Sequence, residues 1–238
     1  MGKQDKSLKS QNQPYILAFI VLFCAAYVAF LVAPENLFAE FRNAFSQFTA
    51  KEGVFATALP LLALVLCGII SANGKARLVF WRWKHPLPGC RAFSHFAIAD
   101  QRVDVSKLRR LAVVWPETRA EENRVWYGMY KKYENVPKVL DSHRCWLLSR
   151  DLAAISFLFF VCGTFGLVLA RGDVKWPLTY AFMVLCLYLV LLVVARNHAN
   201  RFVGNVLTEY IAGEKQDADA DGEQKAGGDA SHPYRGSI

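Results

Sequence analysis

Four long apolar blocks without a charged side chain restrict what this chain can fold into more than any other feature. They run from Ser10 to Pro34, Gly53 to Gly74, Leu152 to Ala170 and Trp176 to Ala195. Each has about the 20 residues that a helix needs to cross roughly 30 Å of hydrocarbon. A core helix of a soluble protein seldom runs this far without a charge. The sequence therefore predicts an all-α polytopic membrane protein with transmembrane helices at 14–34, 53–74, 151–170 and 176–195.

The first block follows three lysines, Lys3, Lys6 and Lys9, as the core of a secretory signal peptide often does. Its apolar run is longer than the roughly 7–15 residues of a signal core. Its end, Leu31 to Pro34, also lacks the small-x-small pattern of a cleavage site. We therefore expect this block to stay in the protein as a membrane anchor.

Lysine and arginine are divided very unevenly between the loops that the four blocks define. Of the 28 basic residues, 24 lie before the first block, between the second and third, or after the fourth. Because basic loops stay in the cytoplasm, we expect a multi-pass protein of the bacterial inner (plasma) membrane with both termini cytoplasmic. This distribution explains the net charge of +8 without nucleic acid as a partner. The predicted parts are an N-terminal arm (1–13), an outside amphipathic loop (35–52), a cytoplasmic domain (75–150), an outside turn (171–175), a cytoplasmic helical extension (196–212) and a disordered tail (213–238).

Helical patterns also occur outside the apolar blocks. The outside loop places Phe38, Phe41, Phe45 and Phe48 at spacings typical of one helix face. From Pro137 to Cys162 no further Pro or Gly interrupts the chain, which favours one long helix through the membrane boundary. The fourth span is expected to continue to about Ala212 and to end at Gly213. The tail beyond is acidic, glycine-rich and nearly without apolar residues, so we expect disorder there.

The cytoplasmic domain, which lies between spans two and three, is predicted to be small and mainly helical. Leu78 to Trp83 is rich in β-branched and aromatic residues, so it is either an extended stretch or the frayed end of the second span. Asp104 or Ser106 can cap a short helix that runs through Leu111. Pro116 can open a longer helix to about Glu134.

The sequence offers little support for catalysis. The four apolar blocks contain no ionisable Asp, Glu, Lys, Arg or His, which argues against an ion-coupled transporter. No nucleophile elbow, phosphate loop or H-E-x-x-H motif is present. We therefore expect no enzymatic activity, no cofactor and no metal site. The third hypothesis is a membrane-tethered enzyme that uses His and Cys side chains of the cytoplasmic domain. The candidates are His85, Cys90, His95, His143 and Cys145. Their spacing matches no common zinc module.

A basic and aromatic stretch follows directly after the second block. Positive charge beside aromatic rings also suits single-stranded nucleic acid. Next to a span, however, such residues ordinarily anchor the chain among anionic lipid headgroups. We therefore predict membrane lipids, and no nucleic acid, as the partner of Lys75, Arg77, Trp81, Arg82, Trp83 and Lys84.

Four aromatic residues gather on the longer helix of the cytoplasmic domain: Trp126, Tyr127, Tyr130 and Tyr133. They form either the core of the domain or a surface for a partner or ligand, because aromatic faces are common binding surfaces. Our leading hypothesis is a non-catalytic inner-membrane protein that binds a partner or signal through this domain. The partner is a different protein or further copies of the same chain.

The alternative is an oligomeric channel or a membrane-permeabilising effector gated by the cytoplasmic domain. The helix, tight two-span hairpin and helix of the C-terminal half resemble membrane effector modules of bacterial sensing and defence systems. The four-span topology also resembles oligomeric channel and motor-stator families. Since the spans lack charge, such a pore would need a lining of polar residues such as Ser156, Thr164, Thr179 and Tyr188.

Overall fold

The computed structural model describes residues 7–32, 65, 67–112 and 114–229, with side chains as far as Glu214. Within these ranges every regular element is helical, as the sequence predicts. Among the described residues, three helical stretches are long and apolar enough to cross a membrane: Leu8–Leu31, Pro137–Arg171 and Lys175–Glu214. They coincide with the first, third and fourth apolar blocks. The second predicted span, at 53–74, falls mostly outside the described residues, and the amphipathic loop at 35–52 falls wholly outside them.

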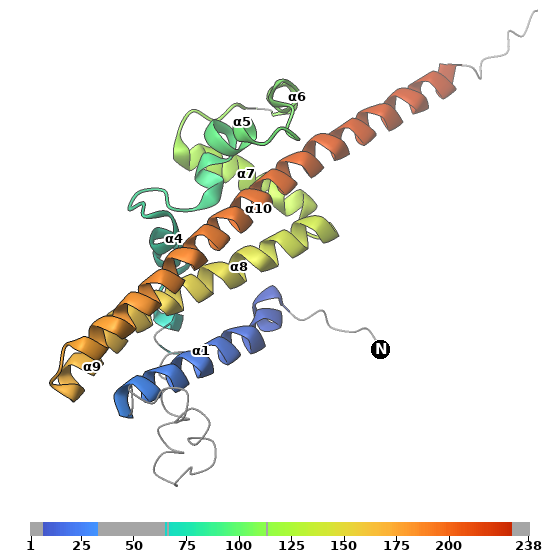
Figure 1. The fold of residues 1–238 in the computed structure, drawn as a ribbon. Coiled ribbons are helices and arrows are strands. Elements are labelled where there is room, and N and C mark those ends of the chain that lie inside the picture. Colours follow the sequence, from blue (N-terminus) through green and yellow to red (C-terminus); the bar gives the residue numbers. More distant parts are fainter. Residues whose placement is uncertain (1–6, 33–64, 66, 113, 230–238) are drawn as a thin grey trace, which may run out of the picture. The chain divides into compact units, whose positions relative to one another are not determined.

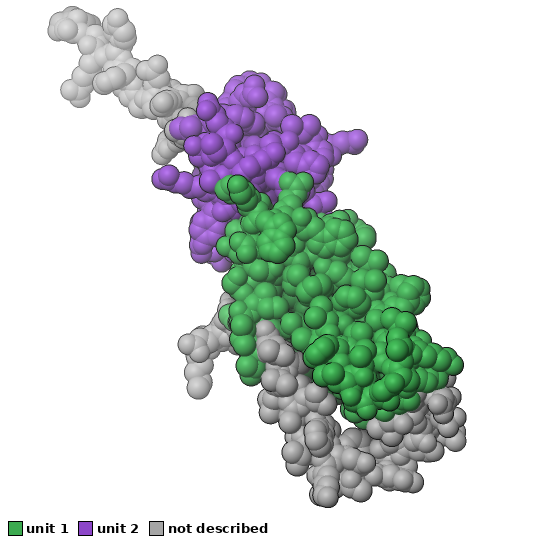
Figure 2. Space-filling model, turned by 90° about the vertical axis from the view of Figure 1, so that its left-hand side faces the viewer, with its two compact units in different colours: residues 1–87, 141–199 green, residues 88–140, 200–238 purple. Residues whose placement is uncertain are grey.

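The chain divides into two compact units, which Figure 2 shows in different colours. Unit 1 comprises residues 1–87 and 141–199, and unit 2 comprises residues 88–140 and 200–238. Two helices contribute residues to both units: α8 (Pro137–Leu158) and α10 (Lys175–Asp229). Each unit is therefore assembled from segments that lie far apart in the sequence.

Unit 1 contains the apolar helices and helix α4. Helix α8 continues through one π-helical segment, η4 (Phe159–Gly163), into α9 (Thr164–Arg171), and this continuous stretch runs beside α10 (Figure 1). Helix α1 (Leu8–Val32) packs on the pair. Its aromatic residues contact those of the hairpin. The ring centroids of Phe30 and Tyr180 are 5.4 Å apart, which lies within the range of about 4.5–7 Å that aromatic pairs prefer.

Helix α4 (Ala72–Phe80) is a separate element and not the end of the second span. The Ser71 hydroxyl caps it by accepting a hydrogen bond from the Gly74 N–H at 3.1 Å. Serine is a favoured residue at this position because its oxygen satisfies an N–H that the helix leaves open. The stretch from Leu78 to Trp83 is therefore neither extended nor a frayed span: it is helical through Phe80 and turns at Trp81.

Unit 2 is a small helical domain. It contains the short helical turns η2 (Pro88–Arg91), η3 (Ala92–Phe96) and α5 (Ala97–Ala99), followed by the helices α6 (Val105–Leu111) and α7 (Arg119–Tyr133). Asp104, one of the two caps that the sequence allows, caps α6. Helix α7 begins at Arg119 rather than Pro116, because Thr118 and Glu121 form a reciprocal capping box. The buried core of the unit combines these elements with the start of α8 and the middle of α10: Cys90, Phe93, Phe96, Leu108, Trp126, Met129, Val139, Phe202, Val203, Val206 and Leu207.

Helix α10 does not end at Gly213, where the sequence predicts its end and the start of a disordered tail, but continues to Asp229. A single glycine weakens a helix by about 1 kcal/mol and does not by itself stop it. Gly213 is explained by a close approach: a Cβ at this position would lie 2.7 Å from ring atoms of Tyr133 on α7. The next residue, Glu214, forms an ion pair with Lys132 at 2.6 Å.

Candidate binding sites at the membrane boundary and on helix α7

A buried ion cluster marks the point where the apolar run of α8 begins. Asp151, the residue before that run, lies 3.3 Å from Lys75 of α4 and accepts hydrogen bonds from Arg150 at 3.0 and 2.9 Å. The side chains of Lys75, Arg150 and Asp151 are only 10%, 12% and 9% exposed. Charges at such a depth are stable when each cation has an anionic partner. The cluster fastens α4 to α8 at this level.

The C-terminal end of α4 is held by α10. The Tyr188 hydroxyl donates to the Leu78 carbonyl at 2.8 Å, and Arg196 Nε donates to the Val79 carbonyl at 2.9 Å. The last carbonyls of a helix lack partners within it, so these donors complete α4. Arg196 is the first charged residue after the apolar run of α10. Both ends of α4 therefore contact the neighbouring helices where their apolar runs meet charged residues.

Trp81 begins an exposed loop whose start is fixed. Its Nε1 donates to the Tyr188 hydroxyl at 3.2 Å, and the Arg196 guanidinium lies 5.4 Å from its ring centroid. Trp81 and His85 have φ angles of 53° and 49°, the only positive values among the described residues other than glycine. Such a conformation is costly for a bulky residue and persists only when the surroundings impose it. Trp83, between them, is 81% exposed.

The six predicted lipid anchors divide into two groups. Arg77, Trp81, Arg82, Trp83 and Lys84 are exposed. Lys75, in contrast, is buried and turns its ammonium group toward Asp151. The charge of Lys75 is thus used within unit 1, because the α4 helix places it on the face that packs against α8. The sequence shows that this lysine is near a span but not which side of the helix it occupies.

Helix α7 turns most of its aromatic residues inward. Trp126 is 5% exposed, stacks on Tyr130 at 5.9 Å and meets the edge of Phe202 of α10 at 5.2 Å. Tyr133 packs against Tyr210 at 6.2 Å, and burial raises the pKa of Tyr130. These three side chains contribute to the packing of unit 2. Only Tyr127, which is 50% exposed, presents its ring to the outside.

A buried carboxylate that the sequence analysis missed joins α7 to η3. Glu122 is 4% exposed and accepts hydrogen bonds from the backbone N–H groups of Phe93 and Ser94, both at 2.9 Å. Arg119 binds its other oxygen at 3.0 Å and also contacts the Ser94 hydroxyl. No local pattern reveals this role, because the acceptor and donors are almost 30 residues apart. It is a structural bond that orients α7.

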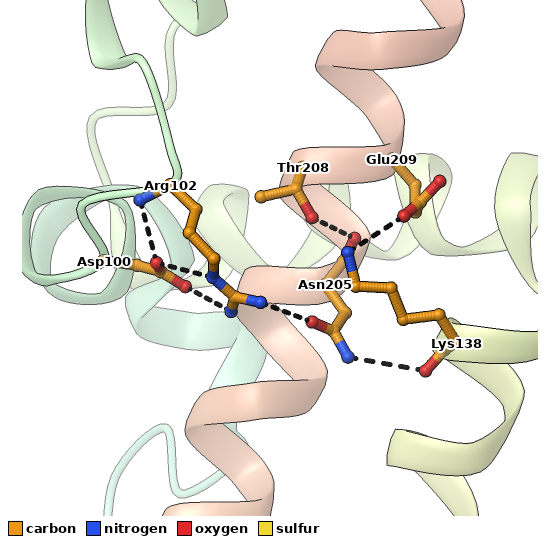
Figure 3. Close-up of polar contacts among 6 residues, drawn as sticks. All are labelled: Asp100, Arg102, Lys138, Asn205, Thr208 and Glu209. Carbon is orange, nitrogen blue, oxygen red and sulfur yellow. Dashed lines mark hydrogen bonds and ion pairs between the residues drawn. The ribbon is translucent and has the colours of Figure 1, made fainter.

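A second polar network ties the loop before α6 to α8 and α10, as Figure 3 shows. Arg102 binds Asp100 through two hydrogen bonds, at 3.0 and 2.7 Å, and donates to the Asn205 side chain at 3.1 Å. The Asn205 amide donates to the Lys138 carbonyl at 3.4 Å, and the Lys138 ammonium pairs with Glu209 at 3.2 Å. The hydrogen bond from Arg102 lowers the pKa of Asp100.

The outward face of α7 contains one glycine, Gly128, that no neighbouring side chain of the described residues requires. A Cβ added at Gly89 would meet the Trp126 ring at 2.6 Å, and one at Gly204 would meet the carboxylate of Asp100. A Cβ at Gly128 would have no described atom within 4 Å apart from its chain neighbours and the backbone of its own helix. Gly128 follows the exposed ring of Tyr127 and lies one turn after the exposed Arg124. These residues form the α7 outer face: Arg124, Tyr127, Gly128 and Lys131.

The residues of the two other hypotheses are dispersed. Within the described ranges, no group of three or more His, Cys, Asp or Glu residues has the geometry of a metal site. His85, His143 and Cys145 belong to unit 1, whereas Cys90 and His95 belong to unit 2. The polar residues considered for a pore do not share one exposed face: Ser156 is fully buried, Tyr188 is bonded to α4, and Thr179 is exposed.

Comparison with known proteins adds no identification. No protein-family model matches this chain, and searches of curated proteins and of solved structures find no match either.

Proposed function

We propose that this chain is a non-catalytic protein of the bacterial inner membrane that crosses it four times and binds a protein partner through a cytoplasmic domain. Three helices of sufficient length and apolarity support the membrane assignment. The location of 24 of the 28 basic residues supports a cytoplasmic position for both termini and for residues 75–150. Most of unit 2 comes from this central segment, so unit 2 is the part that we expect to meet the partner.

The α7 outer face is the surface that we expect to bind the partner. Glycine in the middle of a helix costs roughly 1 kcal/mol relative to alanine. Gly89 and Gly204 are accounted for by side chains that occupy the adjacent space, whereas the space beside Gly128 is open. A glycine on an exposed helix surface allows the backbone of another molecule to approach closely. The half-exposed Tyr127 next to it provides the large ring that often dominates binding energy at a protein interface.

The test is quantitative recovery of cross-linked partners with the full-length protein from its native membrane. Gly128→Leu would fill the open space, and Tyr127→Ala would remove the exposed ring. We expect each substitution to reduce recovery of the same partner several-fold. Gly128 is exposed and Tyr127 is half-exposed, so the unfolding temperature of the purified variants should stay close to that of the parent protein.

Two substitutions elsewhere on unit 2 provide matched controls. Ile98 is 69% exposed on α5, and Ala99 beside it is also exposed. Ile98→Ala and Ala99→Leu alter apolar surface by similar amounts and should leave partner recovery unchanged. An identical set of partners for all four variants would show that the α7 outer face does not bind the partner.

A further inference from the structure

We propose that the loop from Trp81 to His85 is a binding site for the phosphate headgroup of an anionic phospholipid. This inference depends on the apolar helices crossing a membrane, and it is independent of any partner at the α7 outer face. The argument uses the level of the loop along the helices, its fixed conformation and its charge.

The contacts of α4 place the loop at the membrane boundary. Lys75 binds Asp151, which directly precedes the apolar run of α8 and α9. At the other end of α4, the Val79 carbonyl binds Arg196, which directly follows the apolar run of α10. If the third span begins after Asp151 and the fourth ends before Arg196, both residues lie at the same membrane surface. Helix α4 and the following loop, which contact them, then lie at the depth of the lipid headgroups.

The loop is held in an unfavourable conformation that nevertheless exposes its side chains. Positive φ angles at Trp81 and His85 bracket it, while Tyr188 and Arg196 hold the Trp81 ring. Backbone strain of this kind is concentrated at binding sites, where it fixes the geometry in advance. In this loop it presents Trp83, the most exposed tryptophan described, between Arg82 and Lys84.

The charge of the loop determines the class of ligand. Arg77, Arg82 and Lys84 are exposed, and their charged side-chain groups form no hydrogen bond or ion pair with the described residues for which contacts are given. The sequence has no Asp or Glu between Glu52 and Asp100 that could neutralise them locally. A phosphate group can accept hydrogen bonds from both a guanidinium and an ammonium group. The exposed indole of Trp83 favours a phospholipid over a soluble anion, because tryptophan partitions to the interface between headgroups and acyl chains.

Quenching of tryptophan fluorescence by brominated lipids tests the site in the full-length protein. The protein is reconstituted in vesicles that contain a minor fraction of brominated phosphatidylglycerol or, in parallel, brominated phosphatidylcholine. We expect stronger quenching by phosphatidylglycerol, and we expect Trp83→Phe to remove most of the difference. Each cation near an anionic surface contributes roughly a fivefold preference, so Arg82→Gln and Lys84→Gln should reduce the selectivity stepwise.

The matched control is Lys107→Gln with Arg110→Gln, which removes two exposed cations from α6 in unit 2. This pair should leave the lipid selectivity unchanged. Equal quenching by the two lipids in the parent protein would reduce the loop to a non-selective interfacial anchor and overturn the proposal. Relief of the quenching by millimolar inorganic phosphate would overturn it as well, because it would assign the cations to a soluble anion.

Discussion

At the scale of single residues, Asp151 is expected to contribute strongly to the stability of unit 1. Its carboxylate is the shared acceptor for the buried cations Lys75 and Arg150. Removing one partner of a buried ion pair costs roughly 3–5 kcal/mol, because the remaining charge is left without compensation. Asp151→Asn should therefore lower the unfolding temperature in detergent strongly, whereas Lys75→Met should lower it less because Asp151 keeps Arg150. Asp141→Asn, at an exposed position on the same helix, is the control. If Asp151→Asn and Lys75→Met lowered the unfolding temperature as little as this control, Asp151 would not stabilise unit 1 through its ion pairs.

Asp100 introduces a pH dependence into unit 2 at the same scale. The Arg102 hydrogen bond lowers the pKa of this carboxyl in the folded protein, and the unfolded value is about 3.9. A lowered folded pKa stabilises the protein above the unfolded pKa, and this contribution is lost as the pH falls through the folded value. Asp100→Asn should therefore lower the unfolding temperature at neutral pH, and the difference from the parent protein should shrink below about pH 4. A difference that stays constant from pH 7 to pH 3 would show that the charge of Asp100 does not contribute.

At the scale of elements, the two faces of α7 should respond oppositely to one added methyl group. Gly128→Ala adds a Cβ to open space on the outer face and should raise the free energy of unfolding by about 0.5–1 kcal/mol. Gly89→Ala forces a Cβ toward the buried Trp126 ring on the inner face, and overpacking of this kind costs roughly 1–3 kcal/mol. Denaturant unfolding of the two variants measures both effects. Destabilisation by Gly128→Ala would mean that the outer face is already covered within the protein.

At the scale of the whole molecule, the charge distribution predicts which side of the membrane each connection faces. A reporter enzyme that works only in the cytoplasm should be active when fused at Gln101 or Gln224. A reporter that works only outside the cytoplasm should be active when fused at Gln47 or Asp173. Helix α9 ends at Arg171 and α10 begins at Lys175, so the connection between them is short. A fusion at Asp173 is therefore the most direct test of the third and fourth spans. A cytoplasmic result at Asp173 would exclude the proposed orientation of these two spans, and a cytoplasmic result at Gln47 would exclude that of the first two.

Composition and local pattern were sufficient to predict the helical class and three helices that can cross a membrane. The same local patterns limited the cap of α6 to Asp104 or Ser106, and Asp104 is the cap. These features depend on physical effects that act within one segment, namely the exclusion of charge from hydrocarbon and the capping of open N–H groups. The predicted end of α10 at Gly213 was wrong, because the sequence rule treats a glycine after an apolar run as the end of a helix. Gly213 instead makes room for Tyr133, a residue from another helix.

The tertiary structure alone decided how the candidate sites are built. Periodicity indicated an aromatic face on α7, but only the contacts with Phe202 and Tyr210 show that Trp126, Tyr130 and Tyr133 turn inward and leave Tyr127 exposed. Likewise, its position in the sequence grouped Lys75 with the exposed lipid anchors, although its ammonium group is paired with Asp151. Pairings between residues far apart in the chain depend on how helices pack against one another, and no local sequence pattern encodes that arrangement.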